Sequence, residues 1–182
     1  LILEPTDWVL MNFIMDARTG LGRFRDFKIS NYQLMMKLID ACKDHSIEEI
    51  LQMEDVAERV SLYHEHNEMA KAQIAKCSTV YDNLVVLDLT DQETIYATNR
   101  FVIYAMYPDC NISIHKMWGL KKQNVVFAIG KSITNRSSKT NVGELCLKYG
   151  GGGHMNAGTC QVETSKAETV LGELIETITS DG

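Results

Sequence analysis

The sequence NVGELCLKYGGGGHMNAGTCQV, residues 141–162, contains four consecutive glycines followed directly by a histidine. The residues before the run predict a short helix, and the residues after it, 157–162, predict a strand. A helix that ends at a left-handed residue needs one glycine, which Gly150 supplies. Each further glycine costs about 0.5–1 kcal/mol of backbone entropy relative to alanine. Gly151, Gly152 and Gly153 therefore require a second explanation.

Two explanations account for the extra glycines. Without β-carbons, backbone N–H groups can line a concave surface that a phosphate reaches without a steric clash. His154 would then add a directional donor or a partial positive charge. Alternatively, the glycines allow a loop to pack tightly beneath a neighbouring strand or helix. We favour contact with an anion, because four glycines with an adjacent histidine exceed what a tight turn needs.

The loop at residues 130–141, GKSITNRSSKTN, precedes the glycine run by one short helix. It offers cations, hydroxyls and amides that suit phosphate and ribose oxygens, among them Lys131, Ser132, Arg136 and Asn141. Taken alone, this composition is typical of a solvated loop. Its position next to the glycines favours a shared phosphate pocket.

Composition limits the classes of protein that this chain can represent. The chain has 182 residues, of which 45% are hydrophobic and 23% charged, so ordinary globular folding is expected. The net charge of −6 argues against broad, sequence-independent wrapping of nucleic acid. Charged or polar residues interrupt every apolar run before it reaches membrane-spanning length. The five widely spaced cysteines predict reduced, mostly buried thiols in a cytoplasmic protein.

Residues 79–182 predict a self-contained α+β unit with a mixed β-sheet and helices on one face. The order is strand, helix, two strands, helix, strand, helix. The closing helix begins at a capping box formed by Ser165 and Glu168. The expected elements cover residues 79–89, 98–107, 110–118, 123–132, 141–150, 157–162 and 164–180.

Residues 30–77 predict three helices. Ser30 with Gln33, and Ser46 with Glu49, form capping boxes that start the first two. The third runs from residue 54 to 77 and carries a heptad-like apolar seam with one polar break at Asn67. Few leucines occupy the seam, so we expect a connector helix packed on its own protein. The same helix could also carry self-association into a homodimer.

The sequence of residues 139–162 resembles the associated C-terminal domain of the DHH phosphoesterase superfamily. That domain has a short helix, a Gly-Gly-Gly-His run and an Ala-x-Gly sequence entering a strand. Here these are Gly151–Gly153, His154 and Ala157, with Gly158 directly after the alanine. Residues 11–39 are similar to the end of the catalytic DHH domain, where a hydrophobic strand delivers a metal-binding aspartate, here Asp16. Within the superfamily, the chain most resembles the exopolyphosphatase-related and nanoRNase/pAp-phosphatase group.

The chain departs from this family pattern in two places. Ala17 and Arg18 lengthen the turn between Asp16 and the Thr-Gly pair that should follow it directly. The Asp-His-His string is absent, because Asp44 and His45 are followed by serine at the end of a surface-like helix. A single carboxylate cannot hold two metal ions about 3.5–4 Å apart. Since the chain also begins with leucine, we expect the C-terminal part of a longer protein, catalytically incomplete by itself.

The resemblance implies a remnant of the catalytic domain at 1–40, a helical connector at 41–78 and a substrate-binding domain at 79–182. It implies a metal-dependent phosphoesterase that hydrolyses nucleotides, short oligonucleotides or polyphosphate. Two Mn²⁺ or Mg²⁺ ions, held mostly by a missing N-terminal part, would carry a bridging hydroxide. The expected partner is a phosphorylated small molecule or a short oligonucleotide, with no membrane involved.

Two other functions stay open. Glycine-rich domains of this type also resemble the C-terminal piece of alanyl-tRNA synthetases, which suggests a nucleic-acid-binding module, although the acidic charge weighs against it. A member that senses a nucleotide without hydrolysing it is also compatible with the altered turn after Asp16.

Three further patterns bear on the site. Arg23, next to two phenylalanines, belongs either to a patch that stacks a base beside a phosphate or to a loop with core phenylalanines. The resemblance favours a place for Arg23 in the active-site cleft. His64 and His66 are interpreted as surface residues, because residues two apart do not share a helix face. His115 is interpreted as a histidine with a structural place in the sheet.

Overall fold

The structure is a computed structural model that describes residues 1–182 in two compact units. Unit 1 comprises Leu1–Gln73 together with Ile95–Val102, and unit 2 comprises Ile74–Thr94 together with Ile103–Gly182. Each unit contains its own cluster of buried apolar residues. None of the helices combines the length and the apolar composition that crossing a membrane requires.

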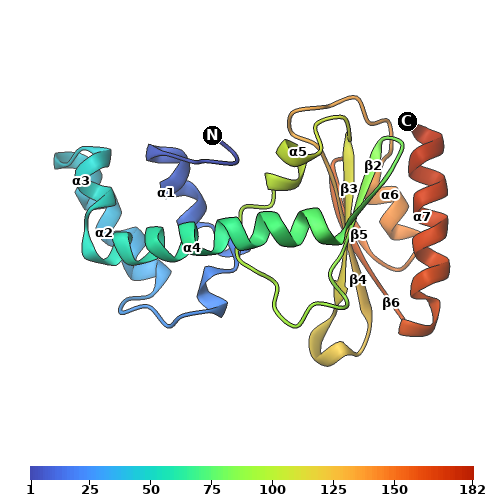
Figure 1. Cartoon of the computed structure of the whole chain (residues 1–182), viewed down its shortest axis with the longest axis horizontal. Helices are drawn as coiled ribbons and strands as arrows, with labels where there is room; N and C mark the ends of the chain where they lie inside the picture. Colours follow the sequence, from blue (N-terminus) through green and yellow to red (C-terminus); the bar gives the residue numbers. More distant parts are fainter. The chain divides into compact units, whose positions relative to one another are not determined.

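Unit 1 is built from helices α1 (Asp7–Met15), α2 (Asn31–Asp44), α3 (Ile47–Leu51) and most of α4 (Glu54–Cys77) (Figure 1). Both predicted capping boxes are confirmed. The Ser30 hydroxyl accepts the Gln33 N–H at 3.1 Å, and the Gln33 side chain accepts the Ser30 N–H at 2.8 Å. Ser46 and Glu49 make the same reciprocal pair at the start of α3.

The apolar segment before Asp16 forms helix α1, so the expected strand there is wrong. Its buried residues are Leu10, Met11, Phe13 and Ile14, whereas Asn12 is exposed. This spacing is helical. A short, nearly continuous apolar run does not distinguish a buried strand from a buried helix, and this run is long enough for more than two helical turns.

Helix α4 covers residues 54–77, as predicted. Its seam residues Val56 and Tyr63 belong to the core of unit 1. The polar residue of the seam also has a hydrogen-bond partner, because the Asn67 amide donates to the Leu3 carbonyl at 3.1 Å. The buried part of the seam therefore packs within its own chain.

Unit 2 contains a six-stranded sheet in the order β1–β2–β3–β4–β6–β5. Strands β2 and β3 are parallel, and every other neighbouring pair is antiparallel, which confirms the predicted mixed sheet. The strands are β1 (Ser78–Tyr81), β2 (Leu84–Asp88), β3 (Ile112–Trp118), β4 (Val125–Lys131), β5 (Gly152–His154) and β6 (Ala157–Val162).

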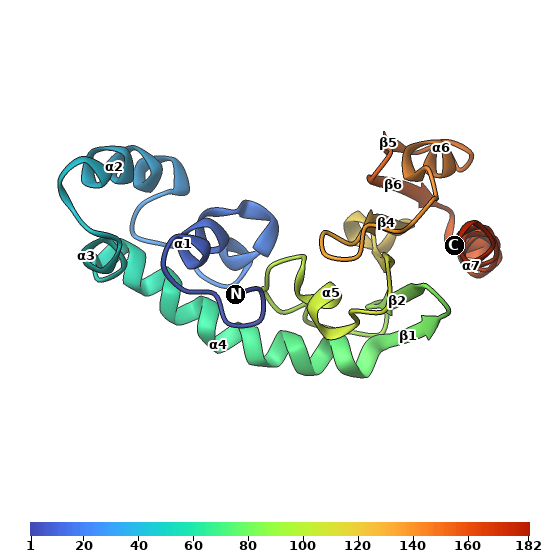
Figure 2. The ribbon, with the colours of Figure 1, turned by 90° about the horizontal axis from the view of Figure 1, so that it is seen from above.

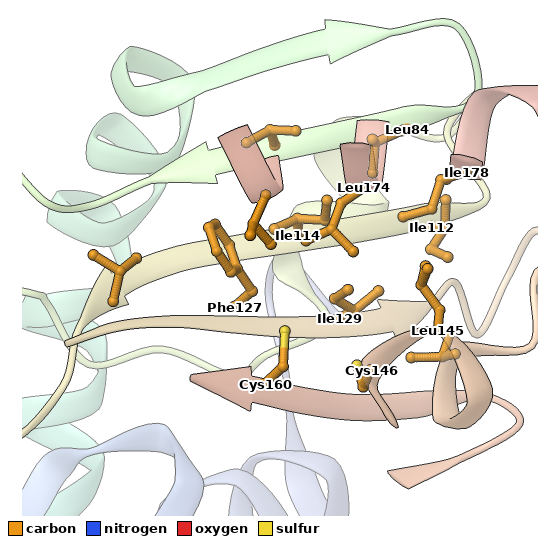
Figure 3. Packing of buried hydrophobic residues seen from close by; sticks show 14 of the residues in the cluster. Leu84, Ile112, Ile114, Phe127, Ile129, Leu145, Cys146, Cys160, Leu174 and Ile178 are labelled. Carbon is orange, nitrogen blue, oxygen red and sulfur yellow. The ribbon is translucent and has the colours of Figure 1, made fainter. Parts of the chain in front are cut away.

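Helices α6 (Val142–Leu147) and α7 (Ala167–Asp181) lie on the same side of this sheet (Figures 1 and 2). Figure 3 shows side chains of both helices, including Cys146 and Leu174, over the face of the sheet that carries Ile114, Phe127 and Cys160, and all five belong to one buried cluster. The short helix α5 (Val102–Met106) meets the other face. There the Tyr104 hydroxyl lies 2.9 Å from the hydroxyl of Ser113, a residue that alternates with the core positions of β3.

Two parts of the sheet differ from the prediction. The expected strand at 79–89 is a hairpin, β1 and β2, whose turn contains Asp82 and Asn83. Asp82 adopts a φ of +48°, a conformation that Asp and Asn tolerate better than most residues. The glycine run continues into the extra strand β5, which pairs with β6.

The predicted capping box at Ser165 is wrong. Residues Thr164–Lys166 form a short 3₁₀ turn, and α7 begins after Lys166 without a side-chain cap. The predicted apolar face of this helix is confirmed, because Val170, Leu174 and Ile178 are buried.

Candidate functional site

Helix α6 and its flanking residues position the glycine run. The Asn141 side chain accepts the Glu144 N–H at 3.3 Å and so caps the start of α6. After the helix, Gly150 adopts a φ of +76°, and the Gly151 N–H donates to the Cys146 carbonyl at 3.0 Å. Gly150 therefore has the left-handed conformation that the sequence predicts for it.

Close packing explains two of the other three glycines. A β-carbon at Gly151 would lie 2.1 Å from the Thr159 carbonyl oxygen, and one at Gly153 would lie 2.3 Å from the Ala157 carbonyl oxygen. Gly152 is different, because a β-carbon there would meet no atom within 4 Å. Packing between β5 and β6 thus requires glycine at 151 and 153 but leaves the glycine at 152 without a packing reason.

Strand β5 lies at the edge of the sheet and pairs only with β6. Its other edge carries backbone groups without a strand partner, next to the open space at Gly152. His154 ends the strand and is exposed. An edge of this kind, with no side chain at Gly152 and an imidazole at its end, can approach an anion closely.

The loop before α6 is bonded to the turn that follows His154. The Lys131 N–H donates to the Asn156 carbonyl at 2.9 Å, and the Val142 N–H donates to the Met155 carbonyl at 3.2 Å. The structure therefore brings the two ends of this loop, at Lys131 and Asn141, to the end of β5.

Within the loop, the predicted residues differ in their contacts. The buried Ser132 hydroxyl accepts the N–H groups of Thr134 and Asn135, so it shapes the loop itself. The Lys131 ammonium donates to the Ser138 carbonyl at 3.0 Å. Arg136 is exposed, donates only to the Ile133 carbonyl at 3.3 Å and makes no ion pair within 4.0 Å.

In unit 1, Asp16 follows α1 and is bound by the arginine two residues later. Its Oδ1 accepts the Arg18 N–H at 2.9 Å and Nε at 2.8 Å, and its Oδ2 accepts Nη2 at 2.8 Å. The Arg18 guanidinium holds the pKa of Asp16 below its usual value. The Asp-x-Arg spacing is the local signal that indicates this pair, and the pair was not predicted from it.

The turn after Asp16 is compact although it is lengthened. The Thr19 hydroxyl donates to the Asp16 carbonyl at 2.8 Å, and Gly20 adopts a φ of +86°. The exposed Arg23 side chain lies over Gly20, because a β-carbon at Gly20 would be 2.2 Å from Nη2 of Arg23. Its neighbours Phe24 and Phe27 pack against the core of unit 1, so the loop combines core phenylalanines with an exposed guanidinium.

Comparison with known proteins places this arrangement in a family. No family model and no curated protein sequence matches the chain. Among solved structures, the chain is similar over its whole length to the pGpG-specific phosphodiesterase PggH from Vibrio cholerae, with 64% identity and a TM-score of 0.96. This match and the glycine-histidine motif agree. The chain corresponds to the C-terminal region of a protein of the DHH superfamily.

A second solved structure shows similarity of the fold alone. An exopolyphosphatase-related protein from Bacteroides fragilis is 16% identical, with a TM-score of 0.51, over 82% of this chain and 43% of its own. The chain spans 62% of the length of the PggH chain.

The DHH-type metal centre expected from the resemblance is not formed by the residues of this chain. No group of three or more His, Cys, Asp or Glu side chains lies close enough together to hold a metal ion. Asp16, the metal ligand that the DHH resemblance implies, has both carboxylate oxygens hydrogen-bonded to Arg18. The side chains present therefore do not fit a two-metal site by themselves.

The histidines outside the glycine run divide between surface and interior. His64 is exposed, as predicted, but the surface interpretation of His66 is wrong. His66 is buried against Phe24, and its Nδ1 accepts the Ala97 N–H at 3.1 Å, so burial lowers its pKa. His115 lies within β3 as a sheet residue, and burial lowers its pKa to about 4.

Proposed function

We propose that this chain is the substrate-binding part of a metal-dependent phosphoesterase that hydrolyses a short nucleotide substrate of the pGpG type. The observation that carries the proposal is the 64% identity to a pGpG-specific phosphodiesterase across all of this chain. This match favours a short linear nucleotide over polyphosphate. In this hydrolysis, water would attack a phosphate of the nucleotide, and the P–O ester bond to an oxygen of the same nucleotide would break.

In this proposal, unit 2 binds a phosphate at the end of β5. Gly152 gives the anion access to the strand edge, because no side chain occupies the space there. His154 and Arg136 supply donors to the phosphate oxygens. The charge of Arg136 is available to an anion because this arginine makes no ion pair. Lys131 and Asn141 hold the loop and the helix start in place.

Divalent ions, Mn²⁺ or Mg²⁺, would supply an activated water for hydrolysis. Because this chain's side chains do not form their site, its own proposed contribution is to bind and orient the substrate.

The test is calorimetric binding of pGpG to the chain and to two matched glycine variants. Gly152 and Gly172 both have room for a side chain, since a β-carbon at either would meet no atom within 4 Å. We expect Gly152→Val to lower the affinity at least tenfold and Gly172→Val to leave it unchanged. His154→Ala should also weaken binding while the thermal unfolding midpoint stays the same.

Two results would contradict the proposal. If the wild-type chain does not bind pGpG, the proposed substrate class is wrong. If Gly152→Val binds as tightly as wild type, the phosphate does not lie at β5, and the glycine run serves packing alone.

A nucleotide sensor without hydrolytic activity is the second candidate, favoured by the engagement of both Asp16 oxygens with Arg18. A sensor would bind pGpG but would not hydrolyse it when Mn²⁺ is added. This should hold even when the chain is joined to the part of PggH that it does not span.

A further inference from the structure

Residues 95–102, here called the strap, pack on unit 1 although the segments on both sides of the strap belong to unit 2. Backbone N–H groups of the strap donate to the Gln73 side chain and to Nδ1 of His66, at 3.2 and 3.1 Å. The Thr98 N–H donates to the Thr19 carbonyl at 3.2 Å, within the turn that follows Asp16. The strap is thus fastened beside the Asp16 turn.

Asn99 fixes the strap immediately before Arg100. Its buried amide donates to the Tyr63 hydroxyl at 3.0 Å and to the Ile2 carbonyl at 3.1 Å, and its Oδ1 accepts the Phe101 N–H at 3.0 Å. Arg100 itself is exposed, and its guanidinium carbon lies 4.7 Å from the centre of the Phe101 ring. The position of Arg100 is therefore set by its neighbours and not by a carboxylate.

The charges of unit 1 single out two arginines. Seven of its nine lysines and arginines form ion pairs, all on the unit's own carboxylates. The two without an ion pair are Arg23, which lies over Gly20, and Arg100, whose charge acts on Asp16 together with that of Arg18. Arg18 thus binds Asp16, Arg23 lies over Gly20 of the same turn, and the charge of Arg100 acts on Asp16, in a chain whose net charge is −6.

A phosphate monoester matches this excess of positive charge. It carries about −1.5 to −2 charges near pH 7 and presents three acceptor oxygens. Guanidinium forks bind such oxygens in pairs, and an exposed guanidinium stacked on an aromatic ring is already oriented to do so. A phosphodiester, with one charge, would gain less at the same place.

We propose that Arg100, with Arg18 and Arg23, binds the terminal phosphomonoester of the substrate at the Asp16 turn. This inference rests on the proposed function and concerns a phosphate site built from residues of unit 1 alone. Arg18 would then divide its hydrogen bonds between Asp16 and the phosphate. The site gives the protein a preference for 5′-phosphorylated dinucleotides over the same dinucleotides with a 5′-hydroxyl.

The test compares calorimetric affinities for pGpG and GpG. We expect Arg100→Gln to lower the affinity for pGpG about tenfold or more and to leave the affinity for GpG unchanged. Arg100→Lys should be intermediate, because it keeps the charge and loses the fork. The control is Arg25→Gln, at an exposed arginine that is already paired with Glu58, and it should not change either affinity.

Each outcome decides between the two proposals. If the wild-type chain binds pGpG and GpG equally, or if Arg100→Gln and Arg100→Lys both keep the wild-type preference, the phosphomonoester site is wrong and the proposed function stands. If the wild-type chain binds neither, the proposed function fails as well. Thermal unfolding midpoints of all variants separate lost binding from lost structure, and Arg100→Lys provides the result if Arg100→Gln does not fold.

Discussion

Neighbouring glycines in the run should respond differently to alanine. Gly151→Ala places a methyl group 2.1 Å from the Thr159 carbonyl oxygen, so we expect a loss of about 1–3 kcal/mol in unfolding free energy. Gly152→Ala meets no atom, and it should lie within about 1 kcal/mol of wild type, on the stabilising side, because alanine restricts the unfolded chain. Urea denaturation of both variants measures the difference. Equal stabilities would show that β5 does not pack on β6 as described.

His115 should make the stability of the protein depend on pH. Its pKa is lowered to about 4 by burial, while an unfolded histidine titrates near its ordinary value of about 6.5. Below pH 6.5 the unfolded chain therefore binds a proton that the folded chain does not, and stability falls until about pH 4. We expect wild type to lose about 1–2 kcal/mol more than His115→Gln between pH 7 and pH 5.

The comparison uses urea midpoints at the two pH values. His66, whose pKa burial also lowers, is present in both proteins and cancels in the difference. If the two proteins show the same pH dependence, His115 titrates equally in the folded and unfolded states.

At the scale of single elements, the two serine positions predicted as caps test what a cap contributes. Ser46→Ala removes the hydroxyl that accepts the Glu49 N–H, so we expect a loss of about 1 kcal/mol. Ser165→Ala lies in a 3₁₀ turn before α7 and removes no cap, so it should stay within about 0.5 kcal/mol of wild type. Thermal unfolding of both variants gives the answer. A larger effect at Ser165 would mean that α7 does begin with a side-chain cap.

Elements that depend on nearby residues were predictable from the sequence. The caps at Ser30 and Ser46 and the bounds of α4 follow from interactions within a few residues. The β1–β2 hairpin was missed because its turn, Asp82-Asn83, looks like two polar positions in a longer strand. Strand β5 was missed because glycine has a low strand propensity and forms this strand only by pairing with β6.

In the candidate site too, features that depend on nearby residues were predictable from the sequence, and features that depend on the folded sheet were not. The short helix before the glycine run and the surplus of glycines carry local signals and were predicted from the sequence. The cap that the Asn141 side chain provides for α6 was not predicted, although it too is a local interaction. The role of Gly151 and Gly153 in packing depends on Thr159 and Ala157, which pair with them only in the folded sheet. Arg100 has no local signal, because the strap is bonded to the Asp16 turn through the Thr98 N–H and the Thr19 carbonyl, which are far apart in the sequence.

At the scale of the whole molecule, the stability of each unit should depend on large side chains buried in that unit, such as Arg59 in unit 1 and Phe127 in unit 2. Arg59 in unit 1 is 0% exposed, donates to the Asp55 and Ile29 carbonyls at 2.7 and 2.8 Å, and lies 4.0 Å from the Phe27 ring. Its removal takes away these side-chain hydrogen bonds and leaves the Ile29 carbonyl without this donor, at a cost of about 3–5 kcal/mol. Phe127 in the sheet of unit 2 is also 0% exposed, and truncating it to alanine costs about 3–5 kcal/mol.

The two tryptophans report these effects separately, because Trp8 lies in unit 1 and Trp118 in unit 2. In a Trp118→Phe background, we expect Arg59→Met to lower the urea midpoint of Trp8 fluorescence. In a Trp8→Phe background, the same change should leave the Trp118 midpoint within error, and Phe127→Ala should give the reverse pattern. Separate cores predict this separation. If both signals shift together for either variant, the chain unfolds as one cooperative body.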